Sequence, residues 1–288
     1  MDAGNSSNDI PCFDSGFPVD FSLAKNITAA NEWYLGARLT GSRHLSPASN
    51  SRDSNMSWMQ WDSSVGVDVS YSSAYQSWMW KRHAGFDVVT YAGNNLTDRR
   101  IPHSLGKVPE MIWIKARIET QNWVAYNKFL NGGVNPHTYK IYPNLTNAEA
   151  ASAFSAEPQT STTFGVKNSH NSFPGGGTQQ HYIAILFASV DGISKCGSYD
   201  GQNSELTITT GFQPRFVIIK CSTASEGWVV LDTLRGWGAG DDKALRLDTN
   251  DAQGSDPYGA PTSTGFTLIG NWNVVNQSGK KYIYYAHA

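Results

Sequence analysis

The side chains that most often do chemistry in proteins occur in this sequence without the spacing that such chemistry requires. The seven histidines show no HxH or HxxxH pair, the spacing that sets two metal ligands on one element. No GxSxG sequence is present to anchor a hydrolase triad. Gly175–Gly177 lacks the Lys and Ser/Thr that complete a phosphate loop. We therefore expect no catalytic residue, no bound metal and no cofactor.

The acidic residues and the cysteines leave one enzymatic alternative open. Asp241 and Asp242 are adjacent but lack the DxDxDG register of a calcium loop, so we expect a solvated loop there. Cys12, Cys196 and Cys221 are an odd number at unrelated spacings, which favours small buried side chains over a disulfide framework or a zinc knuckle. A carboxylate pair for glycoside cleavage is assembled by the fold and not by sequence spacing. A glycan-degrading enzyme therefore stays as the alternative.

The composition argues against strongly charged or lipid partners. The 288 residues carry a net charge of −2, and only 16% of them are charged, so no basic stripe for nucleic acid is present. No apolar run approaches the length of a membrane span, so no membrane insertion is expected. The first residues have neither the basic start nor the apolar core of a signal peptide. Reduced cysteines suit assembly in a cytosol.

Aromatic residues offer a better basis for a binding function. The chain has 10 Trp, 13 Tyr and 12 Phe, more than three small cores must contain. Four tryptophans stand among turn residues, namely Trp58, Trp61, Trp237 and Trp272. An aromatic ring on a polar loop stacks on a sugar or anchors a protein interface. The alternative is a ring that folds back as a lid over its own core, so these four residues are candidate contacts only.

One signature occurs three times along the chain, and it decides how the chain is divided. In each copy a Lys is followed eight positions later by a Trp, and a Pro precedes the Lys by six or seven positions. The residues are Pro18, Lys25 and Trp33, then Pro109, Lys115 and Trp123, then Pro214, Lys220 and Trp228. Strand-like segments follow each copy in the same order. We therefore divide the chain into unit 1 (1–85, divergent), unit 2 (86–192) and unit 3 (193–288).

Local chemistry predicts β-structure throughout the three units. The segment FVIIK, 216–220, is apolar on both faces, which is typical of a strand buried on both sides. Many short strands with regular turn signals predict an all-β fold of three tandem β-sandwich-like, or jelly-roll-like, repeats, each with its own small core. One short helix is expected over 146–154, where Thr146 and Glu149 form a capping box and Pro158 blocks extension.

Structural roles account for the repeated Pro, Lys and Trp. A Pro fits the start of a strand, and a Trp offers a large packing surface with one N–H that needs an acceptor. A Lys at a strand end covers apolar surface with its stem while its ammonium reaches water. The alternative is a Lys and Trp cradle for a sugar in every unit. Repetition alone does not separate the two, because a fold and a site are duplicated together.

The order of the repeated segments resembles that of a family of phage proteins. GFQPRFVIIK, WVVLD, LRL, GFTL, YIYYAHA and the leader GSYDGQN are similar to a repeat that occurs in tandem in virion proteins of tailed phages, particularly those that infect marine cyanobacteria. The resemblance covers essentially the whole chain, strongly in units 2 and 3 and weakly from about Leu39 to Tyr71. It implies a non-enzymatic virion structural protein, tail-fibre-like or associated with the capsid or tail. A head-decorating knob or a tail adaptor is a further alternative.

The same resemblance implies where the protein acts and what it meets. Its location is the virion, after assembly in the host cytoplasm. Its implied partners are other virion proteins, with further copies of this chain among them, and polysaccharide on the host surface. Attachment to that surface or to a glycan is the function usually assigned to such proteins, and the resemblance carries over no catalytic residue.

The start of the chain leads to one more expectation. Units 2 and 3 each follow a strand-like leader, FDVVTYAGN and ISKCGSYDGQN, whereas unit 1 has only DAGN at positions 2–5. One terminal unit is then a strand short, and an unpaired sheet edge invites association with another chain. We expect a terminal unit to make the contact to another virion chain, with unit 1 and its Trp58, Trp61, Trp78 and Trp80 ahead of unit 3.

Overall fold

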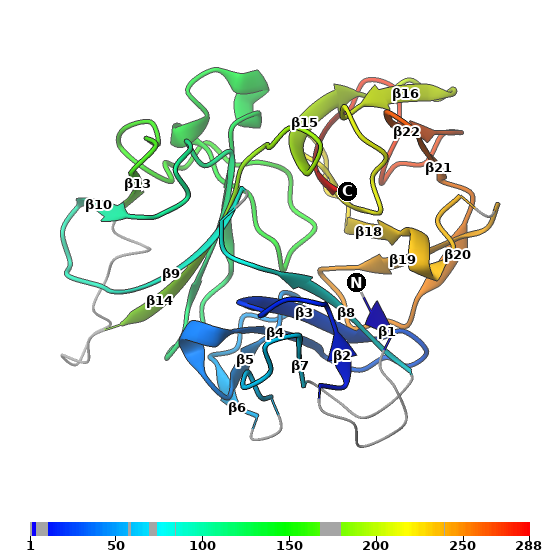
Figure 1. Ribbon diagram of the computed structural model, residues 1–288. Helices are drawn as coiled ribbons and strands as arrows, with labels where there is room; N and C mark the ends of the chain where they lie inside the picture. The colour runs from blue at the N-terminus through cyan, green and yellow to red at the C-terminus, as the bar shows by residue number, and fades with distance from the viewer. Residues whose placement is uncertain are drawn as a thin grey trace.

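Antiparallel β-strands make up most of the regular structure, as the sequence predicts. The computed structural model describes residues 2–3, 11–56, 59–68, 74–83, 85–167, 180–238 and 240–288. Three main sheets surround a common centre (Figure 1), and smaller sheets lie outside them. Short 3-10 helices occur at η1 (Arg38–Thr40), η2 (Leu130–Gly133), η3 (Pro136–Thr138) and η5 (Thr233–Arg235). None of the helices in these residues is long and apolar enough to cross a membrane.

The first main sheet is formed by strands of unit 1. Its strands run in the order β1-β8-β3-β4-β5-β6, with bounds Asp2–Ala3 (β1), Tyr75–Trp80 (β8), Phe21–Asn26 (β3), Trp33–Ala37 (β4), Arg43–Leu45 (β5) and Ser54–Asn55 (β6). A short pair, β2 (Phe13–Asp14) and β7 (Gly66–Val67), packs against its outer face.

The second and third main sheets repeat this plan in units 2 and 3. The second runs β12-β11-β14-β9, with bounds Val124–Asn127, Met111–Ala116, His181–Phe187 and Phe86–Ala92, and its outer pair is β10 (Asp98–Pro102) with β13 (Thr163–Lys167). The third runs β15-β23-β17-β18-β19-β20, with bounds Ser194–Asp200, Lys281–His287, Phe216–Cys221, Trp228–Asp232, Asp242–Arg246 and Gly254–Asp256. Its outer sheet is β16 (Leu206–Thr209), β22 (Gly265–Leu268) and β21 (Gly259–Thr262).

Each main sheet is buried on both faces. In β17, Phe216 and Ile218 pack into the core shared by the three sheets, whereas Val217 and Ile219 pack into a separate cluster under the outer sheet of unit 3. Side chains alternate between the two faces of a strand, so this division is the one that FVIIK predicts.

The shared core joins the three units into one packed body. Trp80 of unit 1 lies 5.9 Å from Phe86 of unit 2 and 5.6 Å from Phe216 of unit 3, measured between ring centroids. Phe187 of unit 2 lies 4.7 Å from Tyr285 of unit 3. The expectation that each unit holds its own core is therefore wrong for the inner faces, because each unit keeps only its outer cluster to itself.

The repeated Lys and Trp occupy the same place in each sheet. Lys25 pairs with Trp33 across β3 and β4, and Lys220 pairs with Trp228 across β17 and β18. Lys115 follows Ile114, whose partner in β12 is the residue after Trp123. The repeated Pro lies two or three positions before β3, β11 and β17. Because it donates no backbone hydrogen bond, Pro fits a position ahead of the ladder.

Two local expectations are corrected by the structure. The segment 146–154 is not a helix; the Thr146 carbonyl and the Glu149 amide bond to unit 3 instead. A short isolated helix is only marginally stable, so these tertiary bonds decide its conformation. Asp242 is not solvated but 1% exposed, and its carboxylate accepts hydrogen bonds from the amides of Gly238, Tyr258 and Gly259.

Candidate functional site

The three repeated lysines lie in the interior and bond to main-chain carbonyl oxygens. Lys25, Lys115 and Lys220 are each 0% exposed. The Lys25 ammonium donates to the carbonyl of Asn31 at 2.7 Å, and the Lys220 ammonium to that of Glu226 at 2.7 Å. Burial is the main cause that lowers the pKa of each lysine to about 8, because a buried ammonium loses its hydration.

Two of these ammonium groups also reach into a neighbouring unit. Lys25 of unit 1 donates to the carbonyl oxygen of Asn250 in unit 3 at 3.0 Å. Lys220 of unit 3 donates to that of Thr146 in unit 2 at 2.9 Å. The lysines therefore hold a loop of the adjacent unit against the end of their own strand.

The repeated tryptophans make the matching connections with their indole nitrogens. Trp123 Nε1 of unit 2 donates to the carbonyl oxygen of Ser46 in unit 1 at 2.8 Å, and Trp228 Nε1 of unit 3 donates to that of Tyr142 in unit 2 at 3.0 Å. Trp33 Nε1 of unit 1 donates to Thr249 in unit 3 at 2.9 Å. Trp33 Nε1 also donates to the carbonyl oxygen of Arg246 in unit 3 at 3.1 Å. Every unit thus donates an indole hydrogen to one neighbour and accepts one from the other, which closes a ring.

A second set of hydrogen bonds, between main-chain groups, joins the same three pairs of units a few residues further along each loop. The amides of Asp53, Glu149 and Gln253 donate to carbonyl oxygens of the next unit, at 2.7, 2.7 and 3.1 Å. The acceptors lie two positions after the repeated lysines, at Arg117, Ser222 and Ile27 respectively. The loops at 46–53, 142–149 and 246–253 therefore dock in equivalent ways.

The repeated pairs are therefore internal connectors and not open sugar sites. The indole rings of Trp33, Trp123 and Trp228 are at most 2% exposed. The donor groups of the lysines and tryptophans already have acceptors within the protein. A ligand in a Lys and Trp cradle would have to separate two units first.

The loop tryptophans proposed as ligand contacts fall into different environments. Trp61 is 6% exposed and donates to the carbonyl of Gly41. Trp237 is 4% exposed and packs edge-on against Phe266 at 5.8 Å. Trp272 is half-buried and donates to the carbonyl of Pro257 at 3.0 Å. Trp61 and Trp237 thus cover their own cores, and Trp58 lies outside the described residues.

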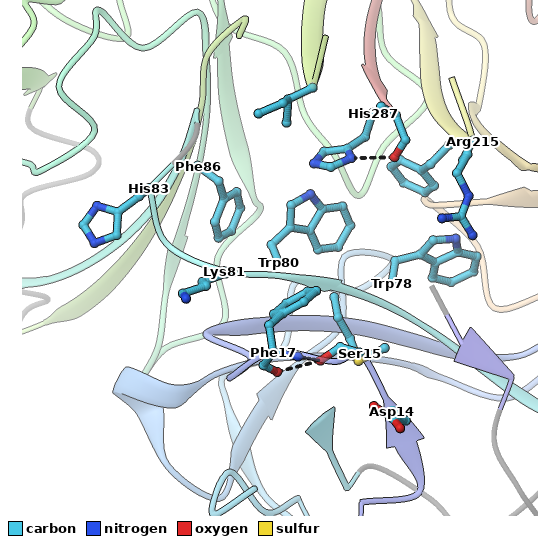
Figure 2. A pocket seen from close by; sticks show the side chains of 14 residues that line it. Asp14, Ser15, Phe17, Trp78, Trp80, Lys81, His83, Phe86, Arg215 and His287 are labelled. Carbon is cyan, nitrogen blue, oxygen red and sulfur yellow. Dashed lines mark hydrogen bonds between the residues drawn. The ribbon is translucent and has the colours of Figure 1, made fainter. Parts of the chain in front are cut away.

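A cleft of about 390 Å³ opens where the three units meet. Figure 2 shows Trp80 at its centre, with Phe86, Trp78 and Phe17 around it. Trp78 and Trp80 come from the last residues of β8, Phe86 begins β9, and Phe216 begins β17. The floor is therefore the end of the shared core, built from the ends of strands in three different sheets, and these four aromatic rings are at most 6% exposed.

Basic side chains surround this floor. Lys81, His83 and Arg215 line the cleft and are exposed. His287, half-buried at the end of β23, has its pKa lowered, mainly by burial, so its imidazole is neutral at pH 7. Asp14 is the acidic side chain on the opposite wall. An apolar floor with a polar rim is the usual anatomy of a protein-binding or ligand-binding surface.

One family matches most of the chain. Its description is "Domain of unknown function (DUF7483)", and the match covers 36–288. The chain belongs to the DUF7483 family. The matched region begins inside β4 of unit 1 and includes all of units 2 and 3, so the DUF7483 domain corresponds to the joined units and not to a single repeat. No curated protein and no solved structure matches the chain.

The cleft could not be found from the sequence, although two of its residues carried a signal. Trp78 and Trp80 take the places that Ile185 and Phe187 hold in unit 2, and the strand registers agree, because Trp80 faces Phe21 as Phe187 faces Met111. Which strand ends meet is decided by how the units pack, and no spacing in the sequence encodes it. Among the described residues, no three His, Cys, Asp or Glu side chains gather as a metal site.

Proposed function

We propose that this chain is a non-enzymatic structural protein of a phage virion, and that it contacts another component of the particle at the cleft between its units. The observation that carries the proposal is the cleft of about 390 Å³ between the units, whose exposed lining includes Lys81, His83 and Arg215 above core rings that are at most 6% exposed. Arginine is among the residues that most often carry the binding energy of protein interfaces.

The connections between units support a structural role. The shared core and the ring of indole and lysine hydrogen bonds fix three sheets relative to one another. A rigid body of this kind presents its binding surface with little loss of conformational freedom, which favours affinity. The resemblance of the repeats to virion proteins supplies the proposed setting, and further copies of this chain and host polysaccharide are among the proposed partners.

The test compares two charge-reversal variants in assembled particles. The first variant is Lys81→Glu combined with Arg215→Glu, which inverts the exposed rim of the cleft. The control is Lys280→Glu combined with Lys281→Glu, at the other end of β23, about 20 Å away along the strand. Copies of the chain per purified particle are counted by quantitative mass spectrometry.

The rim variant is expected to lower the copy number at least about tenfold, which corresponds to a loss of about 1.4 kcal/mol of binding free energy at the contact. The control variant is expected to leave the copy number unchanged. Purified particles without this chain would overturn the virion assignment, and equal copy numbers for both variants would overturn the role of the cleft. Release of reducing sugar from host envelope polysaccharide by the purified protein would favour the glycan-degrading alternative.

A further inference from the structure

Arg215 differs in charge from the residues that hold its place in the other two units. Three amides bond to the last residue of the neighbouring strand, namely Asp20 to Trp80, Glu110 to Phe187 and Arg215 to His287. The two acidic residues have partners, because Asp20 accepts from the amide of Arg82 at 2.8 Å and Glu110 from that of Ser189 at 3.0 Å. The guanidinium of Arg215 has no hydrogen-bond or ion-pair partner among the described residues.

Two further donors in the cleft lack an acceptor. Lys81 is exposed, and its ammonium has no partner in the part of the chain that the structure describes. Trp78 is 1% exposed, and its buried Nε1 has no acceptor among the same residues. Figure 2 shows this nitrogen on the side of the indole ring that faces Arg215. Charged hydrogen bonds from arginine to a carboxylate are among the strongest in proteins, so the donors of the cleft match a carboxylate.

Two exposed leucines lie at equivalent places on this end of the molecule. The amide of Thr233 donates to the carbonyl of Arg215 at 3.0 Å, and the amide of Arg38 makes the same bond in unit 1 at 2.9 Å. The residues that follow, Leu234 in η5 and Leu39 in η1, are 49% and 47% exposed. Because single exposed leucines are common on protein surfaces, their position at the cleft carries the argument and not their exposure alone.

A third exposed apolar side chain joins the two leucines. Val65 is 42% exposed, and its carbonyl accepts the amide of Ser15, which lines the cleft, at 2.7 Å. On the side of Leu39, η1 lies against β9, whose first residue Phe86 also lines the cleft. Leu39, Val65 and Leu234 form what we call the apolar border. Apolar side chains that gather on one face beside charged groups mark interaction surfaces.

We propose that this end of the molecule docks a different polypeptide, whose carboxylate bonds to Arg215 and whose apolar side chains cover the apolar border. The proposal rests on the proposed binding role of the cleft and names the partner's chemistry. Charge complementarity selects the partner, because Lys81 and Arg215 outnumber Asp14 in the lining. The carboxylate of Asp14 accepts the amide of Gly16 on its own wall at 2.9 Å. A second copy docked through the same surface would set one basic cleft against another, which like-charge repulsion disfavours.

A polypeptide fits this surface better than an acidic polysaccharide, although both offer carboxylates. Sugar rings pack on the faces of exposed aromatic side chains, and Trp78, Trp80 and Phe86 in the floor are at most 6% exposed. The apolar border is aliphatic and offers its contact area to other apolar side chains. The expected partner segment therefore carries Asp or Glu between apolar residues.

Paired substitutions in assembled particles test the apolar border. Leu39→Ser with Leu234→Ser removes two of its side chains, and Leu96→Ser with Ile269→Ser is the control, because these residues are 55% and 37% exposed beyond the ends of β9 and β22. The first pair is expected to lower the copies of this chain per particle at least about fivefold. The control pair should leave the copy number unchanged. Equal copy numbers for the two pairs would overturn the role of the apolar border.

Peptide binding to the purified protein tests the carboxylate contact without any particle. The probe is acetyl-Leu-Glu-Leu-amide, and its control carries Gln in place of Glu. Titration at millimolar peptide is expected to shift the Nε–H resonance of Arg215, with the Gln peptide at least about tenfold weaker, because it lacks the charge. Arg215→Gln should abolish the difference between the two peptides. Absence of the shift, or equal binding of both peptides to the parent protein, would overturn the carboxylate contact.

A cross-link in assembled particles identifies the class of partner. A photo-reactive phenylalanine analogue at Leu234 is expected to attach to a segment of a different polypeptide that contains Asp or Glu, whereas the same analogue at Leu96 is not. Attachment to polysaccharide or to a second copy of this chain would overturn the choice of partner.

Failure of this proposal can be told apart from failure of the proposed function. Discrimination between the Glu and Gln peptides, combined with unchanged incorporation of the rim variant, would sink the proposed function but leave the carboxylate site standing. Reduced incorporation of the rim variant, combined with unchanged incorporation of the Leu39→Ser, Leu234→Ser pair, would leave the proposed function standing and overturn the partner proposed here.

Discussion

Trp228 Nε1 and the carbonyl oxygen of Tyr142 lie 3.0 Å apart, although 86 positions separate the two residues in the chain. Trp228 is 2% exposed, so this hydrogen bond closes a dry contact between units 3 and 2. Its counterparts at Trp33 and Trp123 close the two other contacts. The interior of the protein is thus held by a ring in which each unit is bonded to both of the others.

Replacing Trp228 by Phe is expected to lower the free energy of unfolding by more than the loss of ring volume alone. The Tyr142 carbonyl loses its donor in a buried place, which adds about 1–3 kcal/mol. Urea unfolding followed by far-UV circular dichroism measures the change.

Trp113→Phe is the matched control for this substitution. Trp113 is 1% exposed in the same core, and its Nε1 has no hydrogen-bond partner among the described residues. Trp113→Phe therefore removes comparable volume without breaking a hydrogen bond. Equal losses for Trp113→Phe and Trp228→Phe would mean that the indole bond between units contributes nothing to stability.

Asp53→Asn is expected to loosen the contact between units 1 and 2. The carboxylate of Asp53 is 5% exposed and accepts hydrogen bonds from Arg43 at 2.8 Å and from Arg117 of unit 2 at 2.9 Å. The two guanidinium groups, which are 44% and 18% exposed, share this charge, and removing it should cost about 1–3 kcal/mol. The exposed pair of Asp200 with Lys281 is the control, and Asp200→Asn should change stability by at most about 1 kcal/mol. Denaturant titration that gives similar values for both would contradict this ranking.

Much of the fold could be predicted, because the order of side chains within a single strand or hairpin shows which faces are buried and which residues pair. FVIIK is apolar on both faces, and β17 is buried on both faces. The spacing of Lys25 to Trp33 and of Lys220 to Trp228 matches a pair of strands joined by a short turn, and the registers place each Lys opposite its Trp. Such features depend on neighbours within one hairpin, which a sequence pattern records.

The arrangement between units could not be predicted, because it depends on residues far apart in the chain. Thr146 and Glu149 read as a helix start, yet their main-chain groups bond to Lys220 and Ser222 of another unit. The three units share one core, and no residue pattern within a single repeat predicts this sharing. Trp237 sits among glycines in the sequence but under 5% of it is exposed in the fold.

Trp237→Ala is therefore expected to lower stability, because the ring proposed as a candidate contact covers its own core. The ring packs with Phe266 in the outer core of unit 3, and loss of a buried aromatic side chain costs about 3–5 kcal/mol. Trp272 is half-buried, so Trp272→Ala should cost about 1 kcal/mol. Thermal unfolding of both variants checks the order, and a larger loss for Trp272→Ala would reverse our placement of the two rings.

The three buried lysines are expected to contribute more to stability as the pH rises above about 8. Burial lowers the pKa of Lys220 to about 8 from its ordinary 10.5, and Lys25 and Lys115 behave alike. Between these two pH values the unfolded chain holds the protons that the folded chain has released. Each lysine therefore contributes a rise in the free energy of unfolding with pH across this window, by at most about 3 kcal/mol. Burial raises the pKa of the Cys196 thiol and of the Tyr91 and Tyr199 phenols, and these groups contribute in the opposite direction as the unfolded chain loses their protons.

Lys220→Met separates this contribution from the other groups that titrate at alkaline pH. The variant keeps the apolar stem and removes one titrating amine, while the carbonyls of Thr146 and Glu226 lose their donor. We expect lower stability than the parent at every pH and a smaller slope of the free energy of unfolding against pH between pH 8 and 10.5, measured by urea unfolding at half-unit steps. The slope difference isolates Lys220, because all other titrating groups are common to both proteins. Parallel profiles for the parent and Lys220→Met would show that Lys220 keeps its ordinary pKa in the folded state, and that its carbonyl acceptors offset the cost of its burial.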